Sequence, residues 1–247
     1  MKQDLTLRGP FGELHGVIHK CPDGVAKGNV LLMAHGFRGS MDGGGRASQL
    51  AEEISESLCT VVRFNFTWCT GISNQVAELK AVMDYVRETL NPEKLFLLGR
   101  SFGGATCIIT ACGDEKYRPD GMVLWSAPNS LQKTFIQVLG EDSFNRALQG
   151  EAVVLDDERG KDVIPAAFVR DLLKYDLGKL LCNWQAGPLL IIHGEKDCIV
   201  SPEQAEQNFS LAGGVKELHY MPGDDHHLSL HWKEAGALIK KWLAEFK

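Results

Sequence analysis

The sequence predicts an α/β protein with a mostly parallel central sheet. Short apolar runs that suit buried strands alternate along the chain with segments in which apolar residues recur every three or four positions. Such alternation is typical of βαβ units, whose helices cover both faces of a parallel sheet. The 247 residues suffice for one large domain with a substantial core, and no Pro/Gly/Ser-rich linker divides them. We therefore expect a single domain, residues 1–247.

The first half of the chain begins with a hairpin, because alternating residues on either side flank the turn-like Gly9-Pro10-Phe11-Gly12. Its two strands are expected at 4–8 and 13–19. Further strands are expected where apolar and β-branched residues gather, at 29–34, 60–66 and 94–98. Helices are expected where helical spacing holds, at 43–58, 74–90 and 102–112.

The second half interrupts this alternation. After a strand at 121–125, residues 127–186 carry scattered charges, a hairpin near 153–163 and a helix near 165–174. We expect this segment to be a small inserted lid subdomain. The alternation then resumes, with expected strands at 188–192 and 215–221 and helices at 202–211 and 231–247.

The strongest chemical signal is Gly99-Arg100-Ser101-Phe102-Gly103-Gly104, which lies between a predicted strand and a predicted helix. This is the GxSxG pattern in the context it requires, because the tight turn leaves little room for side chains two residues before and after the serine. We interpret Ser101 as a nucleophile. A phosphate loop is disfavoured, since no GxxxxGK[ST] occurs.

A serine hydroxyl needs a base, and the base needs an orienting acid. Asp197 follows a predicted strand and is the expected acid, with Glu195 and Asp224 as competitors. The base is expected after the last strand, where His226 is favoured and His227 is the alternative.

Two further predictions concern the loops around these residues. The backbone N–H groups of Phe37 and Phe102 are expected to form the oxyanion hole. His35 and His193, each followed by glycine at a strand end, are expected to hold loops through hydrogen bonds. A metal site at the closely spaced groups Asp224, Asp225, His227 and His231 is disfavoured, because no third ligand has a fixed spacing.

Together these motifs resemble the α/β-hydrolase superfamily over nearly the whole chain. His35-Gly36-Phe37 is similar to its oxyanion loop, His193-Gly194-Glu195-Lys196-Asp197 to its acid loop, and Gly223-Asp224-Asp225-His226 to its base motif. The last residue of that base motif is catalytic in the family, which favours His226. The segment after Trp125-Ser126-Ala127-Pro128 resembles the lid of small bacterial cinnamoyl and feruloyl esterases.

Two departures from these relatives alter the expected wall of the site. Asn65 stands where many relatives have aspartate, and a shortened loop through Gly71 lacks their GHG sequence. Arg100 precedes the nucleophile where many have histidine. Aromatic residues expected on or near the mouth of the site, as wall or as core, are Phe37, Trp68, Phe102, Phe135 and Trp184.

The resemblance implies a serine carboxylic-ester hydrolase that forms an acyl-enzyme and needs no cofactor. Its expected substrate is a small ester, either a hydroxycinnamate (feruloyl-type) ester or a short-chain acyl ester. A peptidase, amidase or thioesterase with the same triad is the alternative, and a non-catalytic ligand-binding protein is a third.

Composition bears on partners and location. The mild net charge of −6 argues against nucleic acid, and no apolar run suggests a membrane span or signal peptide. Seven irregularly spaced cysteines without CxxC favour a reducing cytoplasm. A homodimer stays open as an alternative to a monomer.

Overall fold

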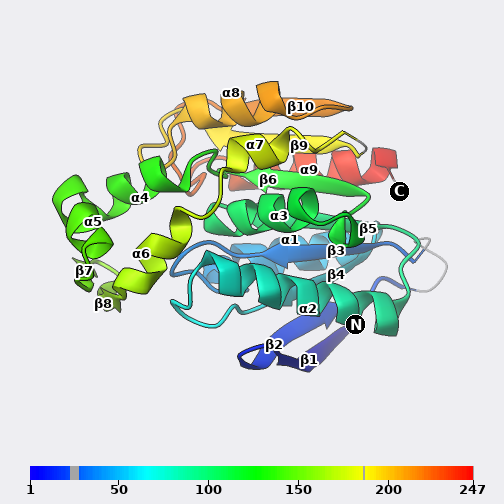
Figure 1. Cartoon of the computed structure of the whole chain (residues 1–247). Coiled ribbons are helices and arrows are strands. Elements are labelled where there is room, and N and C mark those ends of the chain that lie inside the picture. Colours follow the sequence, from blue (N-terminus) through cyan, green and yellow to red (C-terminus); the bar gives the residue numbers. More distant parts are fainter. Residues whose placement is uncertain (23–27, 186, 247) are drawn as a thin grey trace.

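The computed structural model describes residues 1–22, 28–185 and 187–246. Eight strands form one sheet in the order β1-β2-β4-β3-β5-β6-β9-β10 (Figure 1). The pairs from β4 through β10 are parallel, whereas β1–β2 and β2–β4 are antiparallel. The strands are β1 (Lys2–Gly9), β2 (Gly12–His19), β3 (Val30–Ala34), β4 (Thr60–Phe64), β5 (Leu95–Arg100), β6 (Gly121–Trp125), β9 (Leu189–Gly194) and β10 (Lys216–Met221). The expected mostly parallel sheet is therefore confirmed.

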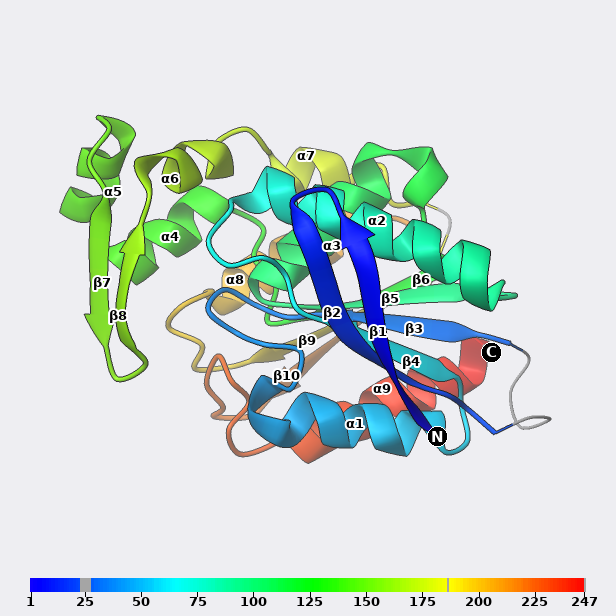
Figure 2. The same cartoon turned by 90° about the horizontal axis from the view of Figure 1, so that it is seen from below.

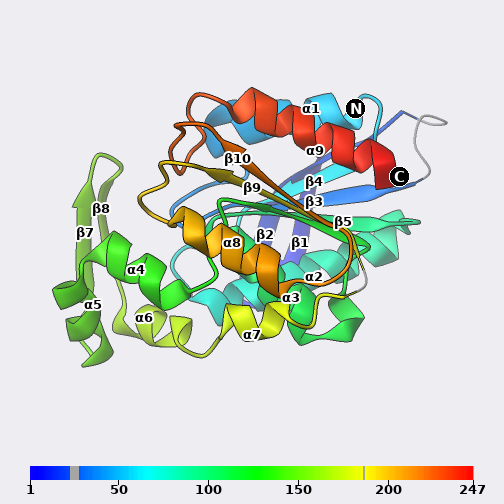
Figure 3. The same ribbon diagram turned by 90° about the horizontal axis from the view of Figure 1, so that it is seen from above.

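Helices cover both faces of this sheet (Figures 2 and 3). On one face lie α1 (Arg46–Ser55) and α9 (Trp232–Phe246). On the other lie α2 (Ile72–Leu90), α3 (Phe102–Gly113), α7 (Leu177–Leu181) and α8 (Pro202–Leu211). Two short 3₁₀ helices, η1 (Gly43–Gly45) and η2 (Glu115–Tyr117), complete the connections. No helix within the described ranges is both long and apolar enough to span a membrane.

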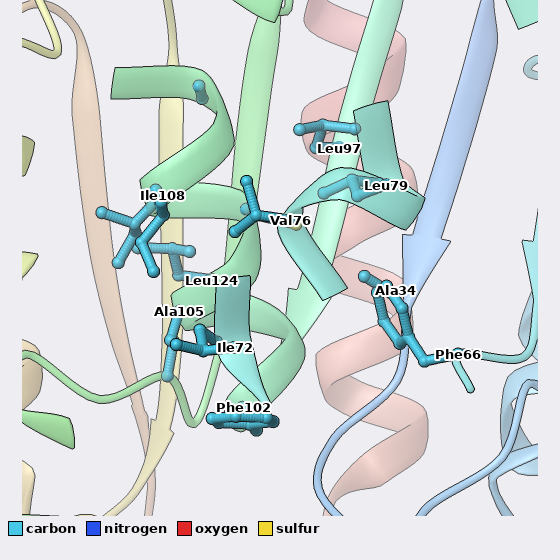
Figure 4. Packing of buried hydrophobic residues seen from close by; sticks show 14 of the residues in the cluster. Ala34, Phe66, Ile72, Val76, Leu79, Leu97, Phe102, Ala105, Ile108 and Leu124 are labelled. Atoms are coloured by element: carbon cyan, nitrogen blue, oxygen red, sulfur yellow. The ribbon is translucent and has the colours of Figure 1, made fainter. Parts of the chain in front are cut away.

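Each face of the sheet has its own apolar core. The strands β3, β5 and β6 are buried over their whole length apart from Arg100, because helices cover them from both sides. Figure 4 shows the larger core, in which Val76 and Leu79 of α2 and Ile108 of α3 pack over Leu97 and Leu124 of the sheet. This packing holds the first turn of α3 rigidly against the end of β5.

The segment between β6 and β9 extends beyond the carboxyl ends of the central strands (Figures 1 and 2). It contains α4 (Leu131–Leu139), α5 (Glu141–Leu148), the antiparallel hairpin β7 (Val153–Asp157) and β8 (Gly160–Ile164), and α6 (Ala166–Leu172). The hairpin expected near 153–163 and the helix expected near 165–174 are both confirmed, as β7–β8 and α6. The sequence analysis did not predict α4, α5 and α7, which are only nine, eight and five residues long.

Several other boundaries differ from the expectation, and two of these differences affect the loops beside the site. The helix expected at 43–58 starts only at Arg46, because Gly43, Gly44 and Gly45 all adopt positive φ angles that favour glycine. The strand expected to end at 98 continues through Arg100, which pairs with Trp125 of β6. The sharp turn therefore begins at Ser101 itself rather than at Gly99.

Candidate active site

Ser101 occupies the turn between β5 and α3. Its φ of 52° and ψ of −122° are strained for a residue with a side chain, and the neighbouring packing sustains this conformation. A Cβ on Gly99 would lie 2.6 Å from the carbonyl oxygen of Gly103, so glycine is required at this crossing. The turn thus places the Ser101 hydroxyl beyond the sheet, at the amino end of α3, where the helix dipole favours negative charge.

His226 and Asp197 come to Ser101 from the loops after β10 and β9. The Nε2 atom of His226 lies 2.9 Å from Ser101 Oγ, and its Nδ1 atom lies 2.7 Å from Asp197 Oδ2. Both distances are typical of hydrogen bonds. Since Asp197 accepts at Nδ1, that nitrogen carries the proton and Nε2 is free to accept from the serine hydroxyl.

Asp197 is buried and held by four donors. The backbone N–H groups of Ile199 and Val200 donate to Oδ1 at 2.9 Å, and Oδ2 receives His226 together with His193 Nε2 at 3.2 Å. Burial alone would raise the pKa of the Asp197 carboxyl, but the hydrogen bonds from His193 and His226 hold this pKa well below its usual value. Asp197 is therefore a carboxylate at every pH at which the protein is expected to work.

The competing residues have other partners. Glu195 is exposed and accepts from the backbone of Gly223, whereas Asp224 accepts from the backbone of Asp225, Leu230 and His231 and so shapes the loop. The ring of His227 lies between the guanidinium groups of Arg100 and Arg159, so both of its nitrogens have neighbours other than Ser101.

Desolvation and the nearby Arg100 lower the pKa of His227 to about 4, which makes it a weak base. Across the described ranges, no group of three His, Cys, Asp or Glu side chains could hold a metal ion.

Phe102 directly follows Ser101, and Phe37 directly follows Gly36 in the loop after β3. Gly36 packs against the serine, since a Cβ on this glycine would lie 3.1 Å from Ser101 Cβ. Among the described residues, neither Phe37 N nor Phe102 N donates to a protein acceptor. Both donors therefore remain available to an oxygen bound beside Ser101.

A cavity of about 220 Å³ opens over Ser101 and His226. Its apolar wall includes Phe37, Phe102 and Phe135, whose rings contact one another at centroid distances of 5.1 to 6.1 Å. Phe168 of α6 packs behind this cluster and was not singled out in the sequence, because its spacing matched an ordinary core position.

Two tryptophans near the expected mouth differ from each other. Trp68 is 48% exposed, and its ring stacks on Phe37, which lines the cavity. Trp184, in contrast, is only 1% exposed and donates its indole N–H to the carbonyl of Gly187. Of the two environments expected for Trp184, wall or core, it has the core one, because α7 turns the chain back onto the body of the domain before residue 184.

The two histidines expected to hold loops do form such hydrogen bonds. His35 Nε2 accepts from the backbone N–H of Phe66, and its Nδ1 donates to the carbonyl of Gly36. His193 Nε2 lies 2.8 Å from the carbonyl oxygen of Val200. Asn65, one of the departures from the relatives, accepts from the backbone of Met41 at 2.7 Å. The contacts of His35 and Asn65 join the loops after β3 and β4. The contact of His193 lies within the loop after β9.

Solved structures of several known proteins share this architecture. Est1E from Butyrivibrio proteoclasticus superposes with a TM-score of 0.76 at 17% identity, over 98% of both chains. The α/β hydrolase GrgF from Penicillium sp. sh18 gives 0.76 at 16% identity, over 100% of this chain and 98% of that one. XC6422 from Xanthomonas campestris, described as an α/β serine hydrolase without lid, gives 0.63 at 21% identity, over 99% and 93%.

Sequence comparison reaches less far. The uncharacterized protein YfhR of Salmonella typhi is 24% identical over 156 residues, which are 60% of this chain and 46% of that protein. The chain thus spans about half the length of the curated relatives it matches. No family model matches it. The topology, the strand-to-helix turn at Ser101 and these superpositions together establish that the chain has the α/β-hydrolase fold.

Proposed function

We propose that the protein is a serine hydrolase of carboxylic esters that works through an acyl-enzyme. The observation that carries this proposal is the continuous hydrogen-bonded relay from Ser101 through His226 to Asp197, at 2.9 and 2.7 Å. Nucleophile, base and orienting acid stand in the order and geometry that serine acyl transfer requires.

In the first step, His226 Nε2 takes the hydroxyl proton as Ser101 Oγ attacks the ester carbonyl carbon. The N–H groups of Phe37 and Phe102 stabilise the negative oxygen that develops. The tetrahedral intermediate collapses, the bond to the alcohol oxygen breaks, and His226 donates its proton to the departing alcohol. Asp197 stabilises the imidazolium in between.

The second step reverses these roles. His226 takes a proton from water, the resulting hydroxide attacks the acyl carbon, and the proton then returns to Ser101 Oγ as the acid leaves. Every proton in this cycle passes through His226, so the reaction requires no cofactor.

The aromatic cavity suggests the acyl group. Its volume of about 220 Å³ and its phenylalanine wall suit a flat aromatic acyl group or a short aliphatic one. Est1E, a structural neighbour, has been solved with ferulic acid bound. We therefore propose feruloyl-type or short-chain acyl esters, with the 127–186 insertion acting as a lid that contributes Phe135 and Leu155 to the wall.

The test is hydrolysis of p-nitrophenyl acetate, p-nitrophenyl butyrate and methyl ferulate, compared with a peptide amide. The Ser101→Ala variant should abolish turnover, whereas Ser210→Ala, an exposed serine on α8, should not change it. A fluorophosphonate probe should add its mass to the wild type and not to Ser101→Ala. A folded wild-type protein that neither hydrolyses an ester nor reacts with the probe contradicts the proposal, and faster cleavage of the amide would favour a peptidase.

A further inference from the structure

A second, larger cavity adjoins the site on the side of α1. Its volume is about 580 Å³, and its apolar floor comes from the carboxyl ends of β3, β5 and β6, including Ala34, Leu98 and Trp125. Arg100, Arg159 and His227 line both this cavity and the one over Ser101. A molecule in the larger cavity therefore touches residues that also border the nucleophile.

The charged lining of this larger cavity is entirely basic. Arg38, Arg46, Arg100 and Arg159 line it, with no carboxylate among its lining residues. Arg38 is neutralised, because Asp157 and Asp162 both lie 2.6 Å from its guanidinium. Within the described ranges, Arg46, Arg100 and Arg159 form no ion pair with any Asp or Glu side chain. We call these three residues the arginine cluster.

All three arginines of the cluster contact His227, whose ring cannot accept hydrogen bonds from both Arg100 and Arg159. Arg100 Nη2 lies 2.6 Å from His227 Nδ1, and Arg159 Nη2 lies 2.8 Å from His227 Nε2, while Arg46 donates to the backbone carbonyl of His227 at 3.3 Å. A guanidinium only donates, and a neutral imidazole has a single acceptor nitrogen. One of the two ring contacts therefore lacks an acceptor.

The charges around Arg100 also indicate that the arginine cluster lacks an anionic partner. Arg100 is partly buried, and desolvation together with the like charges of Arg159 and Arg46 lowers its pKa to about 10. The acidic groups whose charges raise the pKa of Arg100 are Asp225 and Asp197. Asp225, however, already accepts hydrogen bonds from Ser229 and from the backbone of His227, and Asp197 accepts from His226. A partly desolvated guanidinium such as that of Arg100 is costly without a carboxylate partner unless an anion joins it.

We propose that the arginine cluster binds the carboxylate or phosphate group of an acidic ester whose carbonyl lies at Ser101. This inference rests on the proposed ester hydrolysis and narrows its substrate class. Guanidinium groups bind such oxyanions through charge-assisted, often bidentate hydrogen bonds, and the arginine cluster presents three of them around one cavity.

Matched ester pairs test the inference. Mono-p-nitrophenyl glutarate and p-nitrophenyl pentanoate differ by a carboxylate in place of a methyl on the acyl side. The pair 4-acetoxybenzoate and methyl 4-acetoxybenzoate places the acid on the leaving group instead. The wild type should favour the acidic member of at least one pair by about tenfold in kcat/KM, and high salt should reduce this preference.

The double variant Arg46→Gln/Arg159→Gln should remove the preference, measured as the ratio of the kcat/KM values of the acidic and the neutral ester of a pair. Arg8→Gln, an exposed arginine of β1, serves as the control for charge alone. Equal preference in the wild type and the double variant, or no preference in either pair, overturns the inference while leaving the proposed ester hydrolysis intact.

If the protein hydrolyses no ester, the proposed function fails, and binding of glutarate or inorganic phosphate to Ser101→Ala then decides about the anion site. Calorimetric binding that the Arg46→Gln/Arg159→Gln substitutions abolish supports the site. Absence of binding, or binding that survives the double substitution, refutes it.

Discussion

At the scale of single residues, two adjacent histidines have opposite environments. His226 is buried between Ser101 and Asp197, with its Nδ1 atom against the carboxylate and its Nε2 atom against the serine hydroxyl. His227 lies between Arg100 and Arg159, which disfavour a positive charge on the ring. A one-residue step along the loop thus separates a proposed general base from a ring that stays neutral.

We predict that His226→Ala lowers kcat for p-nitrophenyl butyrate by roughly 10⁴- to 10⁶-fold, because the serine loses its proton acceptor. His227→Ala should cost less than about tenfold, since a ring with a pKa of about 4 contributes little as a base near neutral pH. Steady-state kinetics on both variants, with circular dichroism to verify folding, measures the difference. Losses of equal size in the two variants would contradict the assignment of the base.

Asp197→Asn carries a second prediction at this scale. The substitution keeps the size of the side chain but removes the charge that orients the His226 tautomer, so kcat should fall by about 10⁴-fold. Asp224→Asn, in the competing acid, should instead act mainly on stability, because Asp224 hydrogen bonds the loop backbone and the ring of His231. A larger kinetic loss in Asp224→Asn than in Asp197→Asn would reverse the roles proposed for them.

At the scale of elements, acidic side chains of the insertion between β6 and β9 contact the body at two places. Arg38, in the loop after β3, bonds Asp157 and Asp162 of the β7–β8 hairpin. Asp171 of α6 accepts from the backbone N–H of Ser73 at 2.8 Å and from its hydroxyl at 2.6 Å. Ser73 lies in the first turn of α2, where backbone N–H groups lack partners within the helix and favour an anion.

We predict that Asp171→Ala lowers the free energy of unfolding by about 2 kcal/mol, because it leaves the half-buried donors of Ser73 without their charged acceptor. Urea unfolding followed by tryptophan fluorescence measures this change. Asp156→Ala provides the control, because Asp156 is an exposed residue of β7 in the same insertion. A loss below about 0.5 kcal/mol for Asp171→Ala would show that the contact does not anchor α6.

At the scale of the whole molecule, buried neutral histidines couple stability to pH. Burial and the charge of Arg63 lower the pKa of His19 to about 4, and Arg63 donates to its Nε2 at 3.0 and 3.2 Å. The unfolded chain binds a proton at His19 near pH 6.5, whereas the folded chain does so only near pH 4. Between these values the unfolded state holds more protons, so stability falls as the pH falls.

We predict that His19 alone accounts for a loss of about 1 to 2 kcal/mol in the free energy of unfolding between pH 7 and pH 5. His19→Gln keeps an acceptor for Arg63 and should flatten this pH dependence. His15→Gln, the exposed histidine on the same strand, should leave it unchanged. Urea titrations at the two pH values measure both, and identical slopes for His19→Gln and the wild type would refute the linkage.

The sequence by itself determined the order of strands and helices and the position of Ser101. Apolar runs of five or six residues predict buried strands directly, and the glycines around Ser101 report the tight turn because no larger residue fits there. Resemblance to known motifs then named Asp197 and His226, which the structure places within hydrogen-bond distance of their partners. The sequence did not predict the helix boundary at the glycine run or the short helices of the insertion.

Only the tertiary structure decided what surrounds Ser101. Arg46, Arg100 and Arg159 come from α1, the end of β5 and the β7–β8 turn, so nothing in their local sequence announces a common site. Trp184 likewise matched a mouth residue in sequence but is buried in the core. The physical reason is that local patterns report which face of an element is apolar. Which side chains meet across the carboxyl edge of the sheet depends on strand order and on how the insertion folds back over it.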